Sequence, residues 1–193
     1  MLKVSEFSFS KVSAIIFDLD DTLVKTSLDF AKLKKEIACP ANDDILTFIA
    51  QIKEHKARQQ AEQKVLLHEL QDAESSAWLP QAQAFVDAAK RYGLPLSIVT
   101  RNCREATNIK LRKNNIPISK VLTREDAPPK PDPTALLSIA NDWQIPCEKI
   151  AYIGDYIYDI QAAHNANMQA WLYKQKNIEN DYTFGECLHF IPK

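Results

Sequence analysis

The sequence has no long hydrophobic run and no excess of charge of one sign. Its 193 residues are 46% hydrophobic and 25% charged, with a formal net charge of -1, as in ordinary globular proteins. No segment reaches the about 18 apolar residues that a membrane-spanning helix needs, and the N-terminus has no signal-peptide core with a cleavage site. We therefore expect a cytoplasmic protein with neither a membrane partner nor a nucleic-acid partner.

The cysteines lack the spacing of a metal site or a disulfide framework. Cys39, Cys103, Cys147 and Cys187 are scattered, with no C-x-x-C pair. This argues against a zinc site and predicts reduced, mostly buried thiols. The chain also has no internal repeat and no low-complexity tract, and its length suits one large domain, or one domain with a small insert.

Four short apolar runs predict the strands of a parallel sheet. They are continuous and rich in β-branched residues, which is typical of strands buried on both faces, and they cover 12–17, 94–99, 149–153 and 169–173. Helix-like stretches alternate with them, at 81–92, 103–115, 133–143 and 156–166. This alternation predicts an α/β fold whose core is a doubly wound, Rossmann-like parallel sheet.

The segment 28–79 breaks the alternation, because it has no strand-like run and reads as helices. Asn42 is a candidate N-cap for a helix with one apolar stripe. That stripe consists of Ile45, Phe48, Ile49 and Ile52, and a second one, on a helix at 57–75, consists of Leu66, Leu67 and Leu70. We predict a small, all-helical cap at 28–79, inserted after the first strand into a core domain of 1–27 and 80–193.

Two carboxylates follow the first predicted strand. Asp18 and Asp20 are two residues apart at its C-terminal end, so they point the same way, into the crevice where open α/β sheets bind ligands. Unpaired, the two would repel each other, so we expect a divalent cation there. Taken alone, this pattern also fits a strand that ends in an acidic turn.

Two further signals carry groups that bind phosphate. Thr100 and Arg101 follow the second strand, where a hydroxyl and the amides of the next helix suit phosphate oxygens, although a threonine there also caps helices. Lys130 lies between prolines at 128, 129, 131 and 133, in a loop that we expect to be extended and stiff. It is able to neutralise a phosphate, and the alternative is a solvated loop lysine.

The last signal follows the third strand. Gly154 allows a tight exit from that strand, Asp155 can complete a metal site, and Asp159 lies one helical turn further on. The alternative for Asp155 is a helix N-cap.

Together these signals resemble the haloacid dehalogenase superfamily, whose hallmark is D-x-D-x-T, then Thr or Ser, then Lys, then G-D-x-x-x-D. All occur here in order, at 18–22, Thr100, Lys130 and 154–159, and the resemblance covers nearly the whole chain. The runs 28–30, 100–102 and 124–131 look like a phosphoglycolate-phosphatase-like subgroup.

The sequence departs from the family pattern at two turns. Asp21 stands where the family often has glycine, and Asn165 or Asn167 stands where the late turn often has glycine. Asparagine tolerates a positive φ. Neither departure removes a catalytic group.

The resemblance implies a magnesium-dependent phosphatase. Asp18 would attack the phosphorus, and Asp20 would protonate the leaving alcohol and then activate water against the aspartyl-phosphate. Mg2+ would be held by Asp18, Asp155 and the backbone carbonyl of Asp20.

The resemblance also implies the remaining roles. Thr100, Arg101 and Lys130 would bind phosphate, and Asp159 would support the metal or orient Lys130. The partner would be a small phosphorylated metabolite, with phosphoglycolate as a first guess, over which the cap closes. Sugar phosphates, nucleotides and amino-acid phosphates stay open, as does the choice between monomer and homodimer.

Within the cap, His68 and Glu69 are the candidates for substrate contacts, and a solvated helix face is the alternative.

Asp20 argues against a haloacid dehalogenase, since halide leaves without a proton. A phosphomutase with the same intermediate stays open, although the cap shows no clear acid or base for it. A catalytically silent phospholigand-binding protein also stays open, although such relatives usually lose Asp18 or Asp20. A receiver domain differs in lacking a helical insert.

Overall fold

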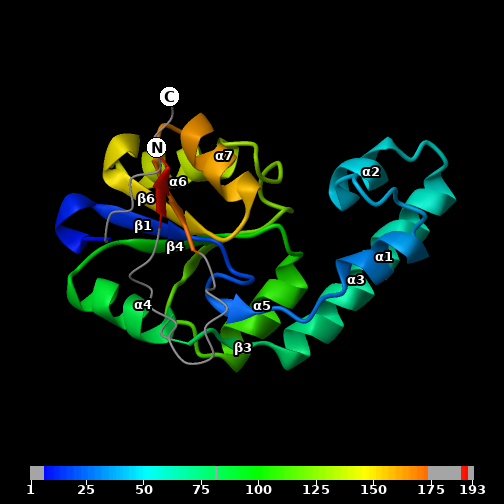
Figure 1. Cartoon of the computed structure of the whole chain (residues 1–193), viewed down its shortest axis with the longest axis horizontal. Helices are drawn as coiled ribbons and strands as arrows, with labels where there is room; N and C mark the ends of the chain where they lie inside the picture. The colour runs from blue at the N-terminus through cyan, green and yellow to red at the C-terminus, as the bar shows by residue number, and fades with distance from the viewer. Residues whose placement is uncertain (1–6, 81, 174–187, 191–193) are drawn as a thin grey trace.

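The computed structural model describes residues 7–80, 82–173 and 188–190 and contains a central sheet in the order β5-β4-β1-β6-β7-β8 (Figure 1). The strands are β1 Ala14–Phe17, β4 Leu96–Val99, β5 Lys120–Leu122, β6 Ile150–Gly154, β7 Gln169–Leu172 and β8 Leu188–Phe190. All neighbouring strands from β5 to β7 in this order pair in parallel, and β8 pairs antiparallel with β7. The predicted parallel sheet is confirmed, with β5 as a strand that the sequence did not reveal.

Helices cover both faces of the sheet, as Figure 1 shows. The two on one face are α4 Ala82–Arg91 and α5 Arg104–Lys113, and the two on the other are α6 Thr134–Trp143 and α7 Ile157–Asn165. Short 3-10 helices lie at Phe9–Lys11 and Cys147–Lys149. The predicted doubly wound arrangement is therefore confirmed.

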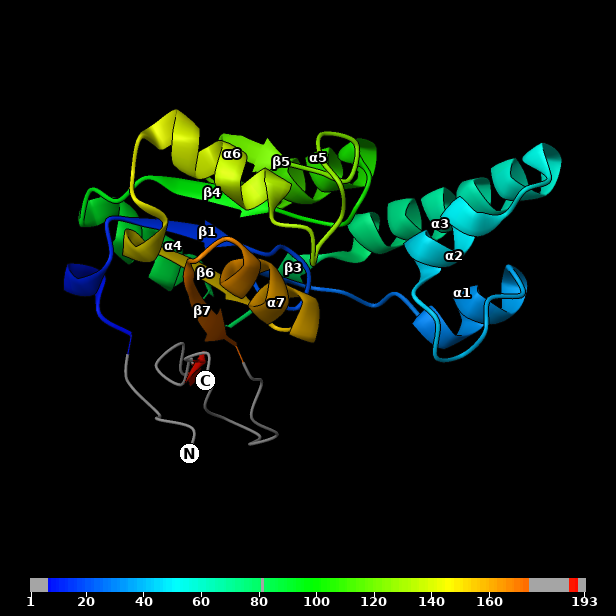
Figure 2. The same ribbon diagram turned by 90° about the horizontal axis from the view of Figure 1, so that it is seen from above.

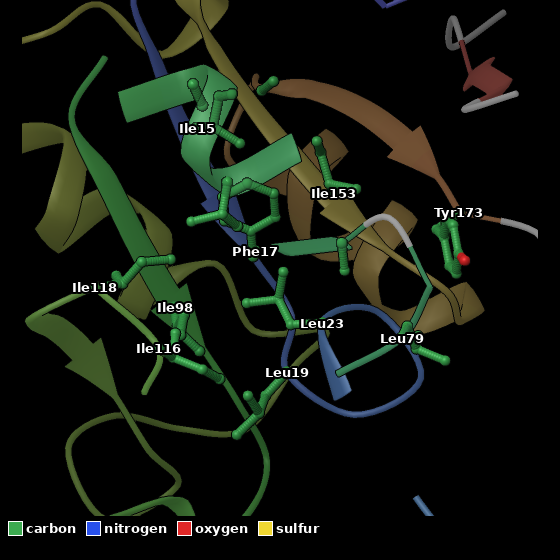
Figure 3. Close-up of a cluster of buried hydrophobic side chains, with 14 of the residues drawn as sticks. Ile15, Phe17, Leu19, Leu23, Leu79, Ile98, Ile116, Ile118, Ile153 and Tyr173 are labelled. Atoms are coloured by element: carbon green, nitrogen blue, oxygen red, sulfur yellow. The ribbon is translucent and has the colours of Figure 1, made fainter. Parts of the chain in front are cut away.

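Strand β1 is buried on both faces because its side chains alternate between two apolar clusters. Ile15 and Phe17 pack on the side of α4, whereas Ala14 and Ile16 pack on the side of α6 and α7. Figure 3 shows the first cluster, where Ile15 and Phe17 lie near Ile153. A central strand with apolar residues at every position is what a sheet covered on both faces requires.

The segment between β1 and α4 forms a helical arm, made of α1 Phe30–Glu36, α2 Ile45–Gln51 and α3 His55–Ser75. Figures 1 and 2 show it extending from one end of the sheet. The arm has its own apolar cluster, in which the buried Ile45 and Ile49 of α2 meet α1 and α3. None of the helices in the described part of the chain is both long and apolar enough to span a membrane.

Two sequence predictions about the arm are wrong. Helix α2 is capped by Asp44, whose side chain accepts a hydrogen bond from the amide of Thr47 at 3.0 Å, and not by Asn42, which lies in the preceding turn. Leu67 does not belong to the stripe of α3, since 53% of it is exposed.

The arm joins the sheet domain through two chain segments that lie side by side. Here β2 Val24–Lys25 pairs antiparallel with β3 Ala77–Trp78, so the predicted helical segment ends in a short strand. We call residues 24–27 and 75–78 the neck.

Cys39 and Cys103 are buried and Cys147 is half-buried, all as free thiols, while Cys187 lies outside the described residues.

Candidate active site

The carboxylates of the first motif lie at the C-terminal edge of β1. The amide of Asp18 still donates to the carbonyl of Ile153 at 2.8 Å, so Asp18 keeps the register of the sheet. The chain then turns sharply, and Asp21 adopts φ 50. A left-handed conformation is tolerated by aspartate better than by most residues, which explains how Asp21 can occupy a glycine-like position.

Lys130 joins three of the groups at this edge. Its Nζ donates to Asp18 Oδ1 at 2.6 Å, to Asp159 Oδ1 at 2.6 Å and to the hydroxyl of Tyr152 at 2.8 Å. The lysine is buried, with 5% of it exposed, so the alternative of a solvated loop lysine is wrong. Tyr152 is a member of this group that the motifs did not reveal, because it lies inside a strand.

The loop that carries Lys130 is a tight turn and not the extended segment that the prolines suggested. The amide of Asp132 donates to the carbonyl of Pro129 at 3.2 Å, and the Lys130–Pro131 peptide bond is cis. A cis proline at the third position of a turn is a known turn type.

The acidic side chains of this edge converge on one point. Oxygens of Asp18, Asp155 and Asp159 lie within 4.8 Å of one another. Burial raises the pKa of Asp18 to about 7, against the opposing effect of Lys130. Burial, together with the charges of Asp18 and Asp159, raises the pKa of Asp155 to about 8. Lys130 pairs with Asp18 and with Asp159, and the three carboxylates together form an oxygen-rich cluster that fits a divalent cation.

Gly154 and Asp159 pack directly against each other. A Cβ placed on Gly154 would fall on the side chain of Asp159, which also accepts a hydrogen bond from the amide of Tyr156 at 3.0 Å. Tyr156 is the N-cap of α7, so the alternative of Asp155 as the N-cap is wrong. The absence of a side chain at Gly154 is therefore what lets Asp159 reach Lys130.

Thr100 lies at the end of β4, buried, with its amide bonded to the carbonyl of Leu122 at 3.0 Å. Its hydroxyl accepts a hydrogen bond from the amide of Asn102 at 3.2 Å. Helix α5 is capped by Cys103, so Thr100 is not the helix cap, and Thr100 is instead one of the residues that line a cleft at this edge of the sheet.

Asp20 is held by different partners from those of Asp18. Lys110 Nζ donates to its Oδ1 at 2.5 Å, and Asn102 Nδ2 donates to its Oδ2 at 2.7 Å. Burial alone would lower the pKa of Lys110, but the carboxylates of Asp20 and Asp72 outweigh burial and raise that pKa, so the ammonium stays charged. Neither Lys110 nor Asn102 was identified from the sequence.

A cleft of about 410 Å³ lies where the helical arm meets this edge of the sheet. Asp18, Asp20 and Asp155 line it, and so does Arg101, which donates to Asp44 Oδ2 at 2.6 Å. Its apolar wall comes from the arm and consists of Leu28, Phe30, Leu33, Ile45, Leu46 and Val65.

The two cap residues predicted to face the substrate lie in different places. Glu69 lines the cleft, is buried, and is held by the amide of Cys103 at 3.1 Å and by Arg124. His68 contacts Glu36 of α1 at 2.8 Å and is not among the described residues that line the cleft.

Residues 15–172 match the family model of haloacid dehalogenase-like hydrolases. A haloacid dehalogenase-like hydrolase domain-containing protein of Arabidopsis thaliana is 26% identical over 78% of this chain, which spans 65% of that relative's length. Pyrophosphatase PpaX of Bacillus velezensis is 30% identical over 85% of this chain and 86% of its own length. The crystal structure of a predicted phosphoglycolate phosphatase from Haemophilus somnus superposes with a TM-score of 0.65 at 20% identity, over 83% of this chain and 84% of that one, and so shares the fold.

Proposed function

The chain belongs to the haloacid dehalogenase-like hydrolases, and from this premise we propose that it is a magnesium-dependent phosphatase of a small phosphate monoester. One observation carries the proposal. Asp18 and Asp20 lie at one sheet edge but are held by different lysines, Lys130 and Lys110. Two carboxylates in separate environments suit two separate roles, a nucleophile and a proton carrier.

In the first half-reaction, Asp18 attacks the phosphorus in line. Its Oδ1 is bound by Lys130 at 2.6 Å, so we assign the attack to Oδ2. A bond forms between Oδ2 and phosphorus while the bond to the leaving oxygen breaks, and Asp20 gives that oxygen its proton. The products are an alcohol and the aspartyl-phosphate, with Asp20 left as a carboxylate.

In the second half-reaction, Asp20 takes a proton from water, and the resulting hydroxide oxygen bonds to phosphorus. The bond to Asp18 breaks, inorganic phosphate leaves, and Asp20 is again protonated. Lys130 and Thr100 bind the phosphate oxygens in both halves. A bound Mg2+, held by Asp18, Asp155 and the Asp20 carbonyl, would supply further positive charge to those oxygens.

The substrate proposed for the first test is phosphoglycolate. Arg101 lines the cleft and pairs there with a carboxylate of the arm, that of Asp44, at 2.6 Å. A substrate carboxylate could take the place of Asp44 on this guanidinium, since arginine binds carboxylates in two-point geometry. Pyrophosphate, whose second phosphate offers similar charge, is the next substrate to test, because a relative is named a pyrophosphatase.

The proposal is tested by phosphate release from an aryl phosphate, with Mg2+ and with EDTA, by the wild-type and Asp18→Asn proteins. We expect turnover that needs Mg2+ and that the variant loses, with circular dichroism to show that the variant is folded. A panel of phosphoglycolate, pyrophosphate, sugar phosphates, nucleotides and amino-acid phosphates then defines the substrate. No phosphate release by folded wild-type protein on any of these would contradict the proposal, and interconversion of sugar phosphates instead would identify a phosphomutase.

A further inference from the structure

Lys110 is a fully buried lysine that lies outside the motifs of the site. It occupies the inner face of α5, and 0% of its side chain is exposed. Its Nζ lies 2.5 Å from Asp20 Oδ1 and 2.7 Å from Asp72 Oδ2. The lysine thus joins a carboxylate of the sheet edge to a carboxylate of α3 in the helical arm.

Asp72 in turn holds the neck. Its Oδ1 accepts from the amide of Ser27 at 2.5 Å and from the hydroxyl of Ser27 at 3.0 Å, and its Oδ2 accepts from the hydroxyl of Thr26 at 2.9 Å. A continuous series of hydrogen bonds therefore runs from Asp20 through Lys110 and Asp72 to the segment where the chain leaves the sheet domain.

The two donors on Asp20 fix its carboxylate from both sides. Lys110 binds one oxygen and Asn102 the other, while 25% of the Asp20 side chain stays exposed at the cleft. With one donor on each oxygen, the carboxylate plane cannot rotate without breaking a bond to a charged or amide nitrogen. Proton transfer depends on this orientation, because the carrier must lie within hydrogen-bond reach of the leaving oxygen.

Packing alone gives little reason to bury a lysine here. Burying an ion pair in a protein interior contributes little net stability, since desolvation offsets the attraction. The side of α5 next to α3 could be filled by an apolar residue of similar length. A role in holding the Asp20 carboxylate explains why a lysine, and not an apolar residue, occupies position 110.

We propose that Lys110 is a positioning residue that orients the Asp20 carboxylate for proton transfer and ties this orientation to the neck of the helical arm. The inference rests on the proposed function, in which Asp20 carries the proton. It adds a residue from α5 and one from α3 to the groups that determine how fast the leaving alcohol departs.

The test compares Lys110→Met with the wild type on two substrates. An alkyl phosphate has a poor leaving group that needs a proton, whereas 2,4-dinitrophenyl phosphate releases an anion that needs none. We expect kcat/KM for the alkyl phosphate to fall by about 100-fold, the loss typical of a catalytic group misplaced by about 1 Å. For the dinitrophenyl ester we expect a change of less than about three-fold, because kcat/KM reports the first chemical step only.

Lys113→Met is the matched control, since Lys113 is an exposed lysine of the same helix that also contacts α3, at the carbonyl of Glu74. It should leave both substrates unaffected. If Lys110→Met alone does not fold, Lys110→Met combined with Asp72→Asn removes both charges of the pair while an amide oxygen remains for Ser27. We expect the same selective loss from this double variant.

Crystal structures of the wild type and of the folded Lys110 variant supply a readout that does not depend on activity. We expect the Asp20 carboxylate to leave the position that it has here. An equal loss on both substrates, or an Asp20 carboxylate that stays in place, would overturn the inference. If the wild type cleaves neither substrate, the proposed function fails, and the crystal structures still decide whether Lys110 positions Asp20.

Discussion

The close contact between Gly154 and Asp159 leads to a sharp prediction for Gly154→Ala. The backbone of Gly154 does not have the positive φ that excludes other residues, so alanine fits the local conformation. Its Cβ, however, would fall on the Asp159 side chain. The carboxylate must then move, and with it goes the hydrogen bond to Lys130 Nζ, now 2.6 Å long.

The structure also indicates the size of the effect. An extra methyl group in a well-packed site typically costs about 1–3 kcal/mol of folding free energy, which for a chain of this length is a fall in Tm of about 2–4 °C per kcal/mol. The displaced Asp159 removes one of the three partners that hold Lys130 beside Asp18, and we expect the resulting shift of Lys130 to lower kcat/KM by about 100-fold. Thermal unfolding and phosphate release on the same preparation measure both quantities.

Gly93→Ala is the control for this experiment. Gly93 has φ 83 and open space around the position of a Cβ, so alanine there meets no neighbour but adopts a left-handed conformation, at roughly 1–2 kcal/mol. We expect a similar loss of Tm with unchanged kcat/KM. If Gly154→Ala keeps wild-type activity, or if both variants lose activity in proportion to their stability, the role assigned to the Gly154–Asp159 contact is wrong.

Three further predictions concern charge. The raised pKa values of Asp18 (about 7) and Asp155 (about 8) mean that the metal-free folded protein holds protons which the unfolded chain has lost. The free energy of unfolding in EDTA should therefore fall as pH rises from about 4 to 8, and the rise in Tm produced by Mg2+ should grow over the same range. A pH-independent effect of Mg2+ in thermal scans would contradict this. Lys130→Met should lower the free energy of unfolding in urea and EDTA by about 3–5 kcal/mol, because two buried carboxylates lose their cation, and a loss below about 1 kcal/mol would be inconsistent with the pairing. Asp44→Asn keeps a good helix cap but removes the carboxylate that pairs with Arg101. Since Arg101 is then free to bind a substrate carboxylate, KM for phosphoglycolate should fall by up to about five-fold, as expected for a partly exposed pair. An unchanged or higher KM would argue against binding of the substrate carboxylate by Arg101.

The strands of the sheet could be predicted where each is a continuous apolar run, as at β1, β4, β6 and β7. Strand β5 was missed because its three residues are only half-buried and lie at the edge of the parallel sheet, so the run is short and mixed. The neck strands have two residues each and show no pattern at all. Their pairing depends on where the arm leaves and re-enters the sheet domain, which is a property of the whole fold.

The residues of the site also fall into those that could be predicted from the sequence and those that could not. Residues next to strand ends, such as Asp18 and Thr100, could be placed because parallel strands bring their C-terminal ends to one edge. The role of Lys110 could not be predicted, because this lysine lies close to Arg112 and Lys113 in a basic run that is typical of a solvated helix face. Only the packing of α3 on α5 buries it, and the partner that it meets there, Asp72, is remote in the sequence.

A protein can need glycine at a position for its backbone conformation or for the space that a side chain would fill, and this chain contains positions of both kinds. The turns at Asp21 and Asn167 need a positive φ, with values of 50 and 55, and aspartate and asparagine tolerate this conformation. Gly154 meets a different demand, because the atoms of Asp159 occupy the space of its side chain, and no residue with a Cβ can satisfy it. A glycine needed for conformation has substitutes, whereas a glycine needed for space has none. That is why the chain can replace the family's glycines at the two turns without disturbing the carboxylates, while Gly154 must stay if Asp159 is to reach Lys130.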